Sequence, residues 1–200
     1  MTPDIGSLFA DPATNGSTPI QVRRVTSASS QPLLIGAGLA RVLAIDPGTR
    51  ESAYVMWDGV AIQKMAKVPN MEIFDVMTGF SKGYTVELCV EMVASYGMPV
   101  GREVFQTVLW IGRFIEQWWR MTAREAYCIL RMDVKKWFCQ DSRAKDANIR
   151  QALIDRFGPP GTLKSPGLLH GVSGDIWSAM AIAVYSTDCR PRTFSAYLAS

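Results

Sequence analysis

Apolar and polar positions follow a two-residue or continuous pattern in one set of segments, which predicts strands. The run RVLAID (41–46) is apolar up to its final aspartate, as is typical of a strand buried on both faces of a sheet. Segments 52–59 and 60–68 predict an antiparallel pair with Asp58-Gly59 as the turn between them. TVELCVEMV (85–93) predicts another buried strand.

A helical period marks a second set of segments. It is clearest over 101–121, where five apolar residues recur at helical spacing: Val104, Val108, Ile111, Ile115 and Trp118. The other predicted elements are helices at 70–80, 133–139, 144–158 and 175–186 and a strand at 125–132. Three meandering strands followed by strands that alternate with helices predict an α/β fold, a mixed sheet flanked by helices.

Composition divides the chain into two parts. Residues 1–38 are rich in Ser, Thr, Pro, Gly and Ala without sustained periodicity, and predict a disordered or loosely attached leader. Residues 39–200 are the predicted folded domain. The 200 residues, 48% hydrophobic and 20% charged, are typical of a globular protein with one domain of ordinary size.

Charge, cysteines and apolar runs restrict the expected cellular location of the protein and the kinds of partner that it binds. No apolar run approaches the roughly 20 residues that a membrane span needs, so no membrane partner is expected. The four cysteines are widely spaced and the N-terminus has no secretion signal, which predicts reduced thiols and a cytoplasmic protein. The net charge of +3 permits a nucleic-acid partner without demonstrating one.

Three carboxylates are candidates for a common site. Asp46 ends the first predicted strand, Glu91 closes the fourth, and Asp175 opens the last helix. If strands one and four are neighbours, the first two lie side by side, and a helix packed over that end brings in the third. Clustered carboxylates repel one another unless they bind hard divalent cations. The cluster therefore predicts a Mg²⁺ site, with Mn²⁺ as a substitute, that activates water against a phosphodiester.

Each acid also has an ordinary structural explanation. Asp46 can cap the Pro-Gly turn that follows it, because Asp-Pro-Gly is common turn chemistry. Glu91 can form a surface ion pair, and Asp175 suits a helix N-terminus, where it interacts favourably with the dipole. The functional interpretation depends on the three acids together.

Four segments in order resemble a known family. VLAIDPGTRESAYV resembles the first strand and hairpin of the RuvC-type Holliday junction resolvases, which have the ribonuclease H fold. LCVEMVASYG resembles their second catalytic strand, AKDANIRQALIDRFG their lysine-bearing helix, and GDIWSAMAIAV their final acidic helix. The similarity covers Arg41 to Ser186 and is nearest to the phage and prophage branch.

The resemblance assigns roles to individual positions. Asp46 and Glu91 match the first two metal-binding acids, and Asp175 the first of two ligands on the closing helix. Ser178 stands at the second of these positions, which is normally aspartate, so the site holds one metal weakly or completes the metal's shell with water, or the protein is catalytically silent. Lys145 matches a basic residue that stabilises phosphate charge in the transition state; a solvated lysine at a helix start is the alternative. For His170 the alternatives are a fourth metal ligand, a proton donor, or a loop residue with a structural hydrogen bond.

The resemblance also implies a function and partners. It implies a crossover junction endodeoxyribonuclease that acts in the cytoplasm (the host's, if phage-encoded), with branched DNA, four-way junctions in particular, as substrate. A homodimer would match the symmetry of such a junction, and three tryptophans are candidates for its interface: Trp110, Trp118 and Trp119. Candidate phosphate contacts are Arg50, Arg102, Lys145, Arg150, Lys164 and Arg190.

Three other functions compete with this one. Loss of the last acid favours a junction-binding protein that does not cut. Actin-like and sugar-kinase-like proteins also begin with a strand that ends in D-x-G-T, but they need a second phosphate loop that this chain lacks. Ribosomal-RNA-processing relatives of the fold carry an acidic-arginine stretch that is absent here.

Overall fold

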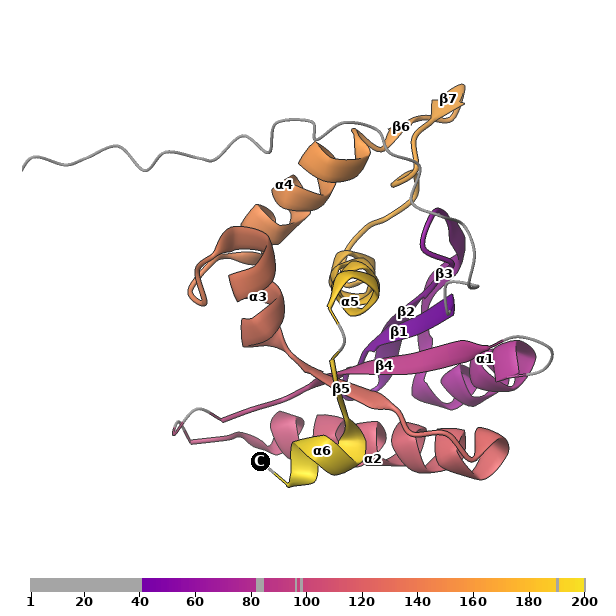
Figure 1. The fold of residues 1–200 in the computed structure, drawn as a ribbon, viewed down its shortest axis with the longest axis vertical. Coiled ribbons are helices and arrows are strands. Elements are labelled where there is room, and N and C mark those ends of the chain that lie inside the picture. Colours follow the sequence, from indigo (N-terminus) through magenta and orange to yellow (C-terminus); the bar gives the residue numbers. More distant parts are fainter. Residues whose placement is uncertain (1–40, 82–84, 96, 98, 190, 200) are drawn as a thin grey trace, which may run out of the picture. The chain divides into compact units, whose positions relative to one another are not determined.

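Strands are arranged in the order β3-β2-β1-β4-β5-β8 in a single sheet of the computed structural model (Figure 1). The structure describes residues 41–81, 85–95, 97, 99–189 and 191–199, so the predicted leader and Arg190 lie outside the described residues. The strands of this sheet are β1 (Arg41–Asp46), β2 (Glu51–Trp57), β3 (Ile62–Pro69), β4 (Val86–Met92), β5 (Tyr127–Leu130) and β8 (Arg192–Thr193).

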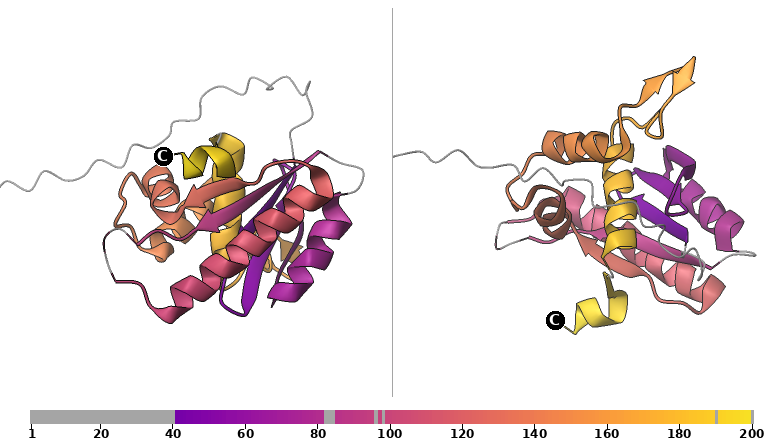
Figure 2. Two further views of the ribbon diagram at one scale, coloured as in Figure 1. Left: turned by 90° about the horizontal axis from the view of Figure 1, so that it is seen from below. Right: turned by 45° about the horizontal axis from the view of Figure 1, so that its top comes forward.

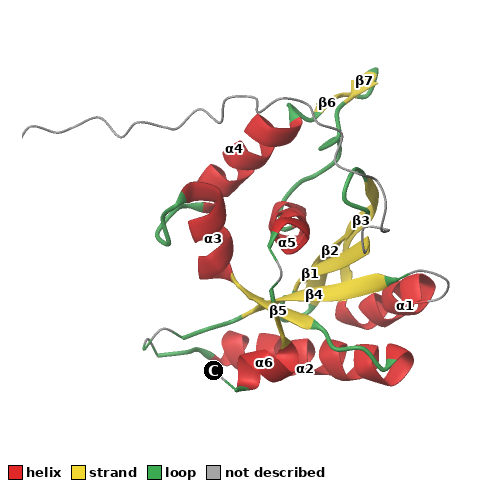
Figure 3. Ribbon diagram, in the orientation of Figure 1, coloured by secondary structure: helices red, strands yellow, loops and turns green. Residues whose placement is uncertain are grey.

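Helices cover both faces of the sheet, as Figures 2 and 3 show. The helices are α1 (Asn70–Ser81), α2 (Arg102–Thr122), α3 (Arg131–Cys139), α4 (Asp146–Phe157), α5 (Ile176–Asp188) and α6 (Phe194–Leu198). Helices α1 and α2 lie on one face, and α3, α4 and α5 on the other. A small hairpin, β6 (Gly161–Thr162) and β7 (Ser165–Pro166), projects between α4 and α5. No helix in the described part of the chain is both long and apolar enough to span a bilayer.

Strand β1 lies in the interior of the sheet. It pairs with β2 in the antiparallel sense and with β4 in the parallel sense, and Ile45 lies opposite Val90. The predicted meander is therefore confirmed, and strands one and four are neighbours, which is the condition under which Asp46 and Glu91 were expected to lie side by side. Asp58 closes the β2–β3 turn, as its Oδ1 accepts hydrogen bonds from the backbone N–H groups of Val60 and Ala61.

Side-chain alternation along β1 places it in two hydrophobic cores. Val42 and Ala44 pack on the α5 side, and Leu43 and Ile45 pack toward α1 and α2. All four are at most 2% exposed. Fully burying an aliphatic side chain of this size contributes about 1.5–3 kcal/mol, so both layers of helices stabilise the strand that carries Asp46.

Several predicted boundaries are wrong. The strand predicted over 125–132 ends at Leu130, and α3 begins at Arg131 instead of residue 133. On α2 the predicted core positions Ile111, Ile115 and Trp118 are buried. Val108 is instead 43% exposed, and Phe114, which was not among the predicted positions, is fully buried. The short elements β6, β7, β8 and α6 were not predicted, since two-residue strands and a five-residue helix carry no measurable periodicity.

Candidate active site

The turn after β1 is held by side chains other than Asp46. The Ser52 hydroxyl accepts a hydrogen bond from the Gly48 N–H and donates one to Asn70 Oδ1, at 3.3 and 2.6 Å. The Asn70 amide donates in turn to the Gly48 carbonyl at 3.0 Å. A side chain at position 48 would clash with the Glu51 carbonyl, so glycine is required there. Ser52 and Asn70 thus supply the turn contacts, and the Asp46 carboxyl faces the sheet's α5 side.

Asp46 and Glu91 meet at the ends of neighbouring strands. Their carboxyls share a hydrogen bond; Glu91 is buried and Asp46 is half-buried. Burial, and then the charge of Glu91, raise the pKa of Asp46 from 3.8 to about 8. Burial also raises the pKa of Glu91, although a nearby guanidinium opposes that shift. Asp46 therefore remains largely protonated at neutral pH, and full ionisation of the pair would leave one negative charge that a single guanidinium does not offset.

That guanidinium belongs to Arg131, the first residue of α3. One terminal nitrogen, Nη1, lies 3.3 and 3.2 Å from the two Glu91 carboxylate oxygens and donates to the Ser178 hydroxyl at 2.9 Å. The other, Nη2, lies 2.8 Å from Asp146 Oδ1 at the start of α4. Arg131 thus joins β4, α4 and α5 around the acidic pair.

Arg131 was not predicted as a site residue, because the apolar pattern extends the predicted strand to residue 132. A signal was nevertheless present. Glu91 lies opposite Ile129 in the parallel β4–β5 pair, so a residue just past the end of β5 must lie near the Glu91 carboxylate. A basic residue at that point of the chain is a candidate partner for a buried acid.

Asp175 lies at the start of α5, at the edge of this cluster. It is exposed, and its Oδ2 lies 2.8 Å from Nζ of Lys67, a residue of the edge strand β3. Its negative charge still contributes to the raised pKa of Asp46. The structure thus brings Asp46 and Glu91 together and leaves Asp175 paired with a lysine. Among the described residues, no group of three or more His, Cys, Asp or Glu side chains is arranged to hold a metal ion.

Lys145 lies immediately before α4, one residue from the Asp146 that contacts Arg131. Its backbone N–H donates to Asn148 Oδ1 at 3.0 Å, and its side chain is exposed. Together with Arg143 it lines a hollow of about 480 Å³ at the α3–α4 turn. The exposed Lys145 thus lies next in the chain to the residue that holds the Arg131 guanidinium.

The other candidate residues lie on several surfaces. Arg50, Arg102, Arg150 and Lys164 are all exposed. The guanidinium of Arg150 lies 4.9 Å from the centre of the Trp177 ring on α5. His170 lies in the loop before α5, where its backbone N–H donates to the Gly167 carbonyl.

The three tryptophans of α2 occupy different environments. Trp118 is fully buried in the core, and Trp110 is half-buried with the Arg113 guanidinium 4.2 Å from its ring centre. Trp119 is 51% exposed, so it alone of the three presents most of its indole to solvent.

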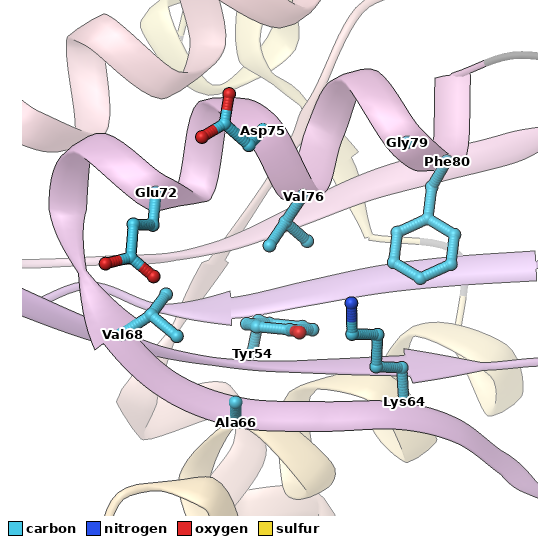
Figure 4. Close-up of a pocket in the computed structure, with 9 residues that line it drawn as sticks. All are labelled: Tyr54, Lys64, Ala66, Val68, Glu72, Asp75, Val76, Gly79 and Phe80. Carbon is cyan, nitrogen blue, oxygen red and sulfur yellow. The ribbon is translucent and has the colours of Figure 1, made fainter.

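A larger hollow lies away from the acidic pair. It has a volume of about 700 Å³ and lies between α1 and β3, where Tyr54 forms its floor (Figure 4). Tyr54 belongs to the core on the α1 and α2 side, opposite the α5 side that carries Asp46. No candidate site residue lines this hollow.

The chemistry of the acidic pair suits a divalent cation. Two carboxyls with hard oxygen donors are held together at the ends of rigid strands, where burial raises the pKa of both groups. The donor set fits one cation held by Asp46 and Glu91. It does not fit a second, because Ser178 is neutral and already accepts a hydrogen bond from Arg131.

Comparison with solved structures places this arrangement in a known fold. A structure of RuvC from Thermus thermophilus matches with a TM-score of 0.57 and 14% identity, over 77% of this chain and 99% of that chain. A structure of Thermus thermophilus RuvC in complex with a Holliday junction substrate matches with a TM-score of 0.56 and 14% identity, over 78% and 99% of the two chains. The chain has the RuvC fold. No protein-family model and no curated protein sequence matches it.

The RuvC fold confirms the predicted ribonuclease H-like architecture and the order of its elements. In this RuvC fold the acids of the first and fourth strands lie together, as the sequence predicted. The guanidinium of Arg131 and the hydroxyl of Ser178 lie against them.

Proposed function

We propose that the protein is a metal-dependent endonuclease that binds branched DNA, four-way junctions in particular, and hydrolyses phosphodiester bonds. The observation that carries this proposal is the buried Asp46–Glu91 pair at the ends of adjacent strands. A RuvC fold that matches a structure solved with a Holliday junction supports the choice of substrate.

In this proposal Asp46 and Glu91 bind Mg²⁺, or Mn²⁺ in its place. Asp175, at the exposed start of α5, contacts the ion through water. A bound divalent ion lowers the pKa of a coordinated water and stabilises charge on a phosphate oxygen. Lys145 supplies a positive charge beside the phosphate. Arg50, Arg102, Arg150 and Lys164 contact the DNA backbone, which positions the nucleic acid without recognising its sequence.

The decisive experiment compares labelled four-way, flap and linear DNA, each with Mg²⁺, with Mn²⁺ and with chelator. We expect wild-type protein to cut branched DNA only when a divalent ion is present. Asp46→Asn should lose at least about a hundredfold in cleavage rate and keep junction affinity, because it removes a metal ligand and leaves the exposed basic residues intact. Asp155→Asn, an exposed acid on α4, is the matched control and should cut normally. Unimpaired cleavage by Asp46→Asn would remove Asp46 from the mechanism.

One observation favours a second candidate, a junction-binding protein without nuclease activity. Arg131 already contributes a positive charge to the acidic pair, and it contacts Ser178, where the resolvase pattern has an acid. The same assay distinguishes the two. Binding of four-way junctions without cleavage in either Mg²⁺ or Mn²⁺ would establish the binding protein and contradict the nuclease.

The assembly proposed is a homodimer formed through α2. Four large apolar side chains of this helix are exposed: Phe105 (64%), Val108 (43%), Leu109 (65%) and Trp119 (51%). Neighbouring exposed apolar residues on one helix are typical of a protein interface. The proposed location is the cytoplasm, which agrees with branched DNA as substrate and with four free cysteines.

A further inference from the structure

We infer that the Arg131 guanidinium takes the place of a second divalent cation, so that the acidic pair accepts one metal ion and excludes another. The inference rests on the proposed function for its substrate, but the contacts that carry it are independent of catalysis.

The position of the guanidinium is the first support. Arg131 Nη1 lies within 3.3 Å of both Glu91 oxygens, so it occupies the side of this carboxylate where a second cation would otherwise bind. Asp146 fixes the other end of the guanidinium group at 2.8 Å. The Arg131 side chain is 30% exposed and the Glu91 side chain 11%, so water screens the pair only partly.

The pairing of Arg131 with Ser178 is the second support. The Ser178 hydroxyl lies 2.9 Å from Arg131 Nη1, where it accepts a hydrogen bond without adding negative charge. An acid at position 178 would bring a further negative charge to this point and would attract a further cation. The neutral hydroxyl and the fixed guanidinium are therefore compatible, and both reduce the net negative charge that would bind a second metal ion.

Counting formal charges gives the same result. Asp46, Glu91 and Asp146 together carry three formal negative charges, and Arg131 offsets one of them. One divalent ion balances the remaining two. Two divalent ions beside a guanidinium would place a large positive excess in a half-buried site, which is strongly unfavourable.

The test measures Mn²⁺ binding to the full-length chain without DNA, by calorimetry and by electron paramagnetic resonance. We expect wild-type protein to bind one Mn²⁺ per chain, with no dipolar coupling between ions. The double variant Arg131→Ala with Ser178→Asp should bind a second, coupled Mn²⁺ and should hold the first at least about tenfold more tightly, because a like charge has been removed and an acid added.

Two further variants keep the result interpretable. Arg131→Lys preserves the positive charge and should still bind one ion, so it shows whether loss of charge or loss of packing matters. Arg120→Ala removes an arginine that pairs with Glu116 on α2, away from the site, and should match wild type. Thermal melts establish that each variant is folded.

Each outcome decides the inference. Two coupled Mn²⁺ ions in the wild-type chain would overturn it, as would no bound Mn²⁺, or a folded double variant with unchanged stoichiometry and affinity. A chain that binds one Mn²⁺ as expected but leaves four-way junctions uncut would contradict the proposed nuclease and leave the assignment of Arg131 intact.

Discussion

At the residue scale, the behaviour of the site depends on how its two buried acids are compensated. Arg131 supplies one charge, yet the pKa of Asp46 remains raised to about 8 by burial and by Glu91. The remaining positive charge must come from a metal ion, a proton or a phosphate-bound cation. Proton uptake and metal binding at Asp46 therefore compete, and both can be measured in the free protein.

Stability should depend on pH through this pair in the metal-free protein. The folded state keeps the Asp46 proton up to about pH 8, whereas the unfolded chain releases it near 3.8. The folded state thus binds more protons between these values, and stability falls as the pH rises through this window. Melting temperatures measured in chelator should therefore decrease from pH 5 to pH 8. Asp46→Asn should flatten this slope and Asp155→Asn should preserve it; parallel slopes for all three proteins would contradict the pKa shift.

Asn70 is the residue on which the geometry of the Asp-Pro-Gly turn depends most. It is 1% exposed and links Ser52 to the Gly48 carbonyl. Asn70→Ala leaves these buried groups without partners and should cost about 1–3 kcal/mol in the free energy of unfolding. Gln63→Ala, which removes an exposed amide bonded to Asp58, should cost less than about 0.5 kcal/mol. Denaturant unfolding measures both, and equal effects would show that the turn network is dispensable.

At the element scale, the strands that carry the acids could be predicted from the sequence because their signal is local. A continuous apolar run predicts β1. The Asp58-Gly59 turn predicts that β2 and β3 form an antiparallel pair, so the three-stranded meander could be predicted. The order of elements allowed the adjacency of β1 and β4 but did not require it. The start of α3 could not be predicted, because Arg131 follows an apolar strand without a capping residue; Leu130 precedes the helix with no side-chain cap. That boundary determines whether the arginine lies in the site.

The contacts of Asp175 were also beyond sequence reasoning. Its position at the start of α5 was correct, but its ion pair with Lys67 depends on how the edge strand β3 approaches the helix. Lysines on edge strands are common, and nothing in the local sequence distinguishes this one. Long-range ion pairs require the tertiary arrangement.

Helix α2 provides the test of the proposed assembly. Leu109→Lys places a charge among the exposed apolar residues and should weaken self-association at least about tenfold, since burying an unpaired charge at an interface is costly. Light scattering across a range of concentrations measures the effect. Leu163→Lys is the matched control, because Leu163 is 90% exposed on the β6–β7 hairpin, away from α2. Equal association of the two variants would exclude α2 as the interface.

At the scale of the whole folded unit, the acids lie on the strands that are most enclosed. β1 and β4 have strands on both sides and helices over both faces. Backbone amides of Ala44, Ile45, Cys89 and Val90 should therefore exchange hydrogen only through global unfolding. Amides of α6 and of the β6–β7 hairpin should exchange much faster. Hydrogen–deuterium exchange resolved by residue would measure this, and fast exchange in β1 would contradict the assignment.

The sheet holds the two acids and the helices carry the residues around them, and this arrangement has a practical consequence. The backbone beneath Asp46 and Glu91 belongs to the interior strands, whereas Arg131 and Ser178, the side chains that adjust the local charge, project from α3 and α5. An engineer could therefore retune the ion preference of the protein by replacing side chains in that outer layer, and the supporting framework would stay as it is.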